Sequence, residues 1–120
     1  MMTYDEWLKA LVEAAQHIAN REYQEKHWFR EKKGVEWADE VFLRLEDLAF
    51  DLFFQMYSHT FTTEQQSAWK EFKTTVDHYE TKLPRYPDSQ RIINDPEWQM
   101  VREAAARFVT AFQKPGDRKL

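Results

Sequence analysis

The histidines are the first side chains to consider for chemistry, because an imidazole serves as a metal ligand and as an acid or base near neutral pH. They are His17, His27, His59 and His78. A metal site on helices usually needs ligands three or four residues apart with a further ligand nearby. No Glu-x-x-His pair and no His-Glu-x-x-His motif occurs. We therefore interpret the histidines as surface or edge residues, and we expect no metal and no cofactor.

Arrangements of residues that could support catalysis are equally sparse. No serine lies in a Gly-x-Ser-x-Gly elbow, and the chain has no cysteine, which excludes a cysteine nucleophile and a disulfide scaffold. His78 lies between Asp77 and Tyr79, with Glu80 next. This order keeps open a small enzyme of unknown substrate that uses His78 with Asp77 or Glu80. We nevertheless expect a protein that is not an enzyme.

An acidic segment is the most informative feature. From residue 36 to residue 51 the chain holds six acidic residues against one basic residue, Arg44, so the local charge is −5 (1 − 6). The acidic residues are Glu36, Asp39, Glu40, Glu46, Asp47 and Asp51. The first sixty residues carry 12 acidic and 7 basic residues, whereas the last sixty carry 9 and 10. The negative charge is therefore concentrated, and dense acid steers a basic partner toward the surface that carries it.

Apolar residues lie among these carboxylates. Leu43, Phe50 and Phe54 are spaced seven and four residues apart, which would place them on one line of a continuous helix. Two interpretations stay open. Either the helix is central in the bundle and is buried on two sides, or the line is an exposed aromatic patch ringed by acids, as in many protein interfaces. The candidate partner-binding residues are Leu43, Phe50 and Phe54 together with the six acids.

Caps and apolar spacing predict the helices that position these residues. Thr3 and Glu6 match a capping box, which predicts a helix from about Tyr4. Its pattern weakens near Asn20, which leaves open one long helix or two. A second helical stretch is predicted over about 35–57. Its broad apolar face comprises Val41, Phe42, Leu45, Leu48, Ala49, Leu52, Phe53 and Met56.

The second half of the chain predicts two further helices. Thr62 and Thr63 each precede a glutamine by three residues, so either can cap a helix that ends at Pro84. Asp95 and Pro96 form a strong start signal for the last helix. The apolar stripe of that helix comprises Trp98, Val101, Ala105, Phe108 and Phe112.

Composition sets the class of the protein. With 120 residues, of which 42% are hydrophobic and 16% aromatic, the chain has material for one core. We predict an all-α, single-domain bundle of four to five helices over residues 1–113, followed by a tail at 114–120.

The net charge of −4 argues against nucleic-acid binding through overall positive charge. No signal peptide and no membrane span is recognisable, so we expect a cytoplasmic protein without membrane contact.

Three segments resemble small bacterial immunity-type proteins, which neutralise a toxin inside the cell that produces it. They are Thr3-Tyr4-Asp5-Glu6-Trp7-Leu8, the helix around Asp39-Glu40 and Asp47-Leu48-Ala49-Phe50-Asp51, and Ile93-Asn94-Asp95-Pro96-Glu97-Trp98. The resemblance implies a cytosolic protein that has no catalysis of its own and binds a toxin domain. A toxin that cleaves nucleic acid usually has a basic active face, which an acidic inhibitor would meet through charge complementarity.

Two non-enzymatic alternatives stay open beside this hypothesis. A homo-oligomeric structural or adaptor protein, such as a homodimer, would use the same apolar line as a self-interface. A small adaptor or regulator of phage or plasmid origin would share the same composition. The leading hypothesis is an immunity or antitoxin-like inhibitor of a basic toxin domain.

Overall fold

The structure is a computed structural model that describes residues 3–28, 38–81 and 92–112, without the side chains of residues 27–28 and 38–41. Its elements are α1 (Tyr4–Ala19), α2 (Arg21–Trp28), α3 (Ala38–Asp47), α4 (Phe50–Tyr57), the 3-10 turn η1 (Ser58–Thr60), α5 (Thr63–Glu80) and α7 (Pro96–Phe112). The all-α class is confirmed. The described residues form six α-helices, more than the expected four to five, because both of the first two helical stretches are divided.

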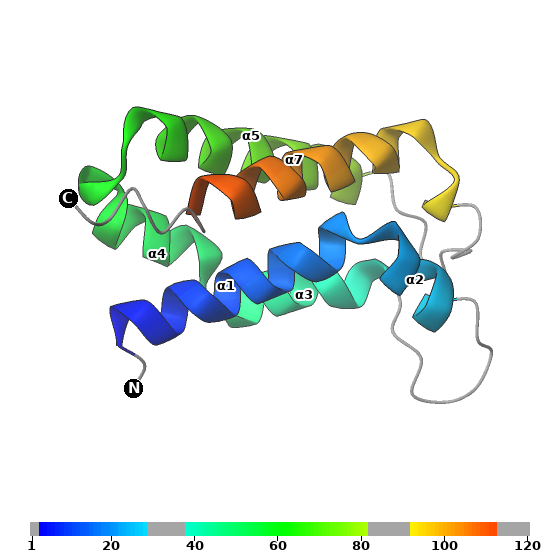
Figure 1. Ribbon diagram of the computed structural model, residues 1–120, viewed down its shortest axis with the longest axis horizontal. Coiled ribbons are helices and arrows are strands. Elements are labelled where there is room, and N and C mark those ends of the chain that lie inside the picture. The colour runs from blue at the N-terminus through cyan, green and yellow to red at the C-terminus, as the bar shows by residue number, and fades with distance from the viewer. Residues whose placement is uncertain (1–2, 29–37, 82–91, 113–120) are drawn as a thin grey trace.

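The helices form two layers (Figure 1). The long helices α5 and α7 pack against each other in one layer, and α1 packs against α3 in the other. The layers meet mainly where α7 lies against α1, and α3 also contacts α5. The short helix α4 lies at one end of the molecule and α2 at the other. In the described part of the chain, no helix is both long enough and apolar enough to cross a membrane.

The helix starts follow the predicted caps. Thr3 and Glu6 form the capping box of α1. Thr62, rather than Thr63, caps α5, and its Oγ1 accepts a hydrogen bond from the backbone N–H of Gln65 at 3.0 Å. Each box satisfies backbone N–H groups that the first helical turn leaves without partners. The predicted starts of these helices are therefore confirmed.

The first helical stretch is two helices, because the chain breaks at Asn20. Asn20 is extended, with φ −99° and ψ 100°, and its Oδ1 accepts a hydrogen bond from the backbone N–H of Tyr23 at 2.9 Å. The buried side chain of Gln24 donates to the carbonyl oxygens of His17 and Ile18 at 3.0 and 2.7 Å. These bonds satisfy carbonyl groups at the end of α1, so the break carries no large hydrogen-bonding penalty.

The second helical stretch is also divided, which corrects the expectation of a continuous helix over 35–57. The stretch breaks at Leu48 and Ala49, and residues 35–37 lie outside the described residues. Ala49 is left-handed, with φ 55° and ψ 52°. It ends α3 where glycine is the usual residue. The Nε1 of Trp7 donates to the carbonyl oxygen of Leu48 at 2.5 Å, which ties α1 to the break.

The break changes which residues of α4 face the core. Phe50 is buried and stacks on Trp69 with ring centroids 4.2 Å apart, whereas Leu52 and Met56, expected on the buried face, are 48% and 46% exposed. Leu43, on the other side of the break, is 50% exposed. A continuous helix would keep Leu43 and Phe50 on one line, but the left-handed residue between them turns α4 about its axis. Of the two interpretations, the exposed line is therefore wrong, because Leu43 is exposed and Phe50 belongs to the core.

Aromatic rings fill the core at the α4 end of the molecule. Trp69 is 2% exposed and contacts the rings of Phe53, Phe61 and Phe108. Phe54, the third member of the expected line, is half-buried and packs against Phe61 and Trp69. The predicted stripe of the last helix is confirmed, since all of its residues are buried: Trp98, Val101, Ala105, Phe108 and Phe112.

Candidate partner-binding site

The acidic residues of the candidate site do not all lie together. Glu46 and Asp47 are exposed at the end of α3, and Asp51 is exposed in the first turn of α4. Glu36 lies outside the described residues, as do the side chains of Asp39 and Glu40. The placement of these last three carboxylates therefore stays a prediction.

A groove of about 240 Å³ runs between the α3–α4 break and the second half of α5. Apolar side chains line its base and one edge: Phe42, Leu45, Ala49, Phe50, Leu52 and Val76. Charged side chains line the rest: Glu46, Asp51, Lys73, Asp77 and Glu80. Four carboxylates and one ammonium therefore surround an apolar base. Three of the candidate residues, Glu46, Phe50 and Asp51, belong to this groove.

Lys73 joins the two walls of the groove. Its Nζ lies 2.8 Å from Asp77 Oδ2 on the same helix and 3.3 Å from Asp51 Oδ2 on α4. The hydrogen bond to Asp77 raises the pKa of Lys73, and Asp51 adds to this effect against the opposing effect of partial burial. Lys73 is the one basic residue among the described residues that line the groove. Its charge balances only part of the negative charge there.

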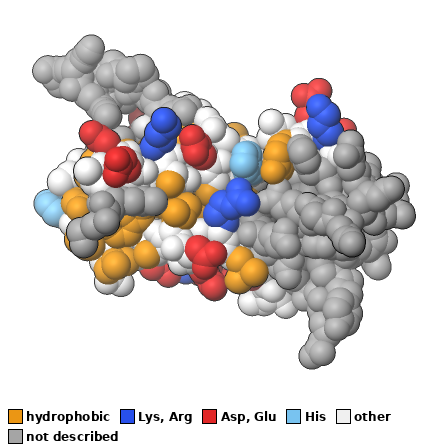
Figure 2. Space-filling view, turned by 90° about the horizontal axis from the view of Figure 1, so that it is seen from below, with side chains coloured by type: hydrophobic (Ala, Val, Ile, Leu, Met, Phe, Trp, Pro, Cys, Tyr) orange, Lys and Arg blue, Asp and Glu red, His pale blue; other side chains and the backbone are white. Residues whose placement is uncertain are grey.

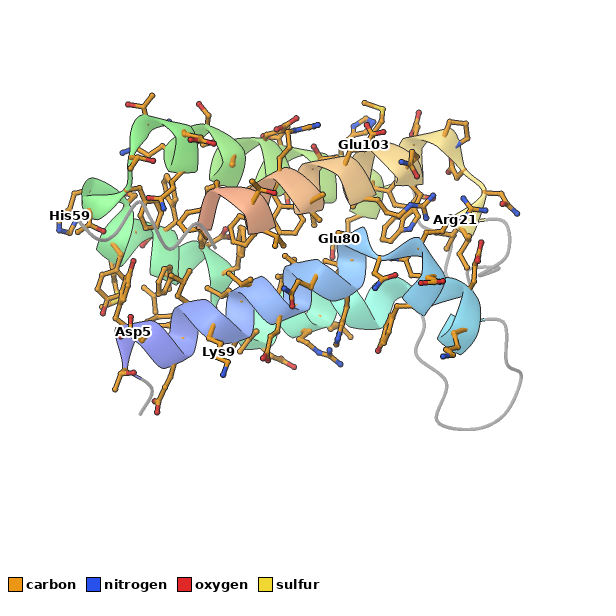
Figure 3. All side chains as sticks on the ribbon, in the orientation of Figure 1. Asp5, Lys9, Arg21, His59, Glu80 and Glu103 are labelled. Atoms are coloured by element: carbon orange, nitrogen blue, oxygen red, sulfur yellow. The ribbon has the colours of Figure 1, made fainter. Side chains whose placement is uncertain are left out.

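The carboxylate of Glu80 has a raised pKa in the groove. Partial burial raises the pKa of Glu80, and the negative charges of Glu46 and Asp77 raise it further. Lys73 acts in the opposite direction without reversing the shift. Figure 3 shows Glu80 at the end of α5, between that layer and the layer of α1 and α3. Within the described residues, Glu80 has no ion-pair partner, so excess negative charge accumulates at this end of the groove.

Exposed apolar side chains border the groove on α4. Leu52 lines its edge, and Met56 follows one turn later on the same side of α4. Figure 2 shows hydrophobic side chains gathered on one face, at the end where α1 begins and α4 lies. The groove therefore combines an acidic rim with accessible apolar surface.

The three histidine side chains that the structure describes do not gather in a metal site. The ring of His17 stacks on Tyr23 at 4.4 Å, and His59 is exposed on η1 at one end of the molecule (Figure 3). His78 is exposed and is not among the residues that line the groove, and the side chain of His27 lies outside the described residues. Among the residues that the structure describes, no three His, Asp or Glu side chains are arranged to hold a metal.

Sequence reasoning did not assign the α5 residues of the groove to the partner site. Lys73, Asp77 and Glu80 are spaced by four and three residues, so they share one face of a helix. That spacing was a usable signal for a charged face. The sequence alone does not show that this face lies opposite the α3–α4 break. The sequence analysis considers Asp77 and Glu80 only as partners of His78 in the enzyme alternative.

No protein-family model, curated protein or solved structure matches the chain.

Proposed function

We propose that the chain is a protein-binding inhibitor, an immunity or antitoxin-like protein that neutralises a basic bacterial toxin domain. It binds through the acidic face formed by the end of α3, the start of α4 and the second half of α5. The acids steer the partner onto this face, and the apolar edge of the groove slows dissociation. The resemblance of three segments to immunity-type proteins supports the choice of a toxin as the partner.

The observation that carries the proposal is the acid-lined groove. Two walls contributed by different helices bring four carboxylates around one lysine, above an apolar base. Carboxylates scattered over a solvated surface would not surround an apolar depression. A basic protein surface supplies both the charge and the apolar side-chain stems that this arrangement accommodates.

The test starts from a purified complex. The tagged protein is used to capture partners from its own host, and the captured partner is then purified and titrated at several salt concentrations. We expect a basic partner whose association slows as salt rises. The Asp47→Lys/Asp51→Lys variant should lower the association rate at low salt by about tenfold or more, with unchanged helix content by circular dichroism. Unaltered binding by this variant would refute the assigned face.

A matched control separates local from overall charge. The Glu22→Lys/Glu103→Lys variant makes the same change in net charge on exposed positions of α2 and α7 outside the groove. Figure 3 shows Glu103 pointing away from the body of the molecule. We expect this variant to change the association rate much less. Equal losses in the two variants would assign binding to net charge rather than to the acidic face.

Exposed apolar side chains favour one alternative, a homodimer. Phe50 is already buried within one chain, so a self-interface would instead use Leu52 and Met56. The native mass of the purified protein decides between the two functions. A monomer that captures a basic partner supports the inhibitor, whereas a dimer dissociated by Leu52→Gln/Met56→Gln, with no captured partner, supports a structural role.

A further inference from the structure

We propose that the groove between the α3–α4 break and α5 receives one arginine side chain of the partner, and that Lys73 holds this position in the free protein. The inference rests on the proposed function, because it specifies how the acidic face recognises a basic protein. It concerns one groove and one side chain, so it can be tested without knowledge of the partner.

The shape of the groove indicates the stem of such a side chain. Three apolar residues that are nearly buried, Phe42, Leu45 and Val76, line the groove on its inner side. Leu52 continues this surface at the edge, where it is 48% exposed. An aliphatic stem can cover such a surface while its charged end stays at the rim.

The rim indicates a cationic end. Glu46 lies on α3, Asp51 on α4, and Asp77 and Glu80 on α5, so carboxylates from three helices line the groove. Lys73 contacts Asp51 and Asp77, but Glu80 and Glu46 form no ion pair with described residues. The groove therefore already binds one ammonium and still carries uncompensated negative charge.

Arginine fits this arrangement better than lysine. A guanidinium is planar and offers five N–H donors, so it can serve carboxylates from two walls at once. An ammonium is a compact point charge. The ammonium of Lys73 contacts two carboxylates of the groove and leaves the other two without a cation among the described residues. The entering arginine would bind Asp51 and Asp77 in place of Lys73 and direct its remaining N–H donors toward Glu80, and Lys73 would turn into solvent. Lys73 is then an internal competitor that weakens binding and favours partners with a well-placed arginine.

The probe is n-butylguanidinium, which reproduces the stem and head of arginine. It is titrated into the full chain labelled with 15N, and amide shifts are followed by NMR. We expect saturable shifts at residues 45–52 and 73–80, weaker binding of n-butylammonium, and none of the neutral n-butylurea. Binding of n-butylammonium as tight as that of n-butylguanidinium would overturn the arginine assignment, and an absence of shifts in these segments would overturn the site.

Removal of the internal competitor gives a second measurement. Lys73→Met keeps the aliphatic stem and frees both aspartates, so n-butylguanidinium should bind about three- to tenfold tighter. Lys70→Met is the matched control, because it removes the same charge from an exposed position of α5 that does not line the groove. We expect little change in the control. Equal affinities of Lys73→Met and the unaltered chain would contradict the role of Lys73.

These results separate the two proposals. If the groove ignores the probe while a basic protein still binds in a manner that depends on Asp47 and Asp51, the arginine site is wrong and the proposed function stands. If the probe occupies the groove but no basic protein partner is found, the proposed function fails and the arginine site stands.

Discussion

Replacement of Ala49 by glycine should stabilise the protein, although the same replacement in a regular helix destabilises. Ala49 has φ 55° and ψ 52°, which is the left-handed helical region. It is the one non-glycine residue with a positive φ among the described residues. The Cβ atom of an L-residue crowds the following carbonyl oxygen in this region, whereas glycine has no Cβ and adopts it freely.

The size of the effect follows from two opposing terms. Relief of the left-handed conformation contributes about 1–2 kcal/mol. Glycine also increases the freedom of the unfolded chain, which costs about 0.4–1 kcal/mol. The expected net gain is about 0.5–1 kcal/mol, or roughly 2–4 °C in Tm for a chain of this length. The hydrogen bonds of Ala49 itself are backbone bonds, such as its N–H to the carbonyl of Glu46 at 2.9 Å, and glycine keeps them.

Urea unfolding followed by tryptophan fluorescence measures the gain, with thermal melting as a second readout. Ala106→Gly is the control, since Ala106 is exposed inside α7 and glycine there should cost about 1 kcal/mol. The same chemical change is therefore expected to have opposite signs at the two positions. If Ala49→Gly destabilises as much as Ala106→Gly, then α3 and α4 form a continuous helix in solution, and the proposed geometry of the groove is wrong.

Two other substitutions test the charge in the groove and the buried polar contacts of α2. The pKa of Glu80 is raised above 4.5 in the folded protein, so over the pH range between the two pKa values the folded protein holds a proton that the unfolded chain has released. The free energy of unfolding should therefore fall as the pH rises from 4.5 toward the raised pKa. Glu80→Gln should therefore be more stable than the unaltered chain at pH 7 and equally stable below both pKa values. Urea unfolding across pH measures this difference. A variant with the same pH profile as the unaltered chain would contradict the raised pKa of Glu80. Gln24→Leu removes the Oε1 acceptor to which Trp98 Nε1 and the buried Arg102 both donate at 3.0 Å. We expect the free energy of unfolding to fall by about 2–4 kcal/mol. Adding Arg102→Met should recover part of this loss, because it removes the buried charge that is left without its acceptor. A loss below 0.5 kcal/mol would be inconsistent with this cluster.

Local signals predicted the helix starts well, because a cap involves only neighbouring residues. Thr3 with Glu6, and Thr62 with Gln65, form capping boxes within three residues of chain. The apolar stripe of α7 was equally predictable, because a regular helix repeats its buried face. These features need no knowledge of the rest of the fold.

The break at Ala49 could not be predicted in the same way. Neither Leu48 nor Ala49 is a helix breaker, and the acidic segment reads as continuous and amphipathic. The break depends on distant residues, since the indole of Trp7 binds the freed carbonyl of Leu48 and Trp69 packs on Phe50. Tertiary contacts thus override a local preference, and the buried face of α4 includes Phe50 and Phe53, whereas Leu52 and Met56 are exposed.

The same break decides which carboxylates can act together. In a continuous helix Asp47 and Asp51, four residues apart, would share one face. In the structure Asp51 lines the groove beside Lys73, whereas Asp47 is exposed outside its lining. Charge density along the sequence therefore locates the acidic face only approximately. The change of direction at the α3–α4 break determines which carboxylates line the groove. Since Ala49 itself lines the groove, the strained residue that sets the core packing of α4 also sets the geometry of the proposed site.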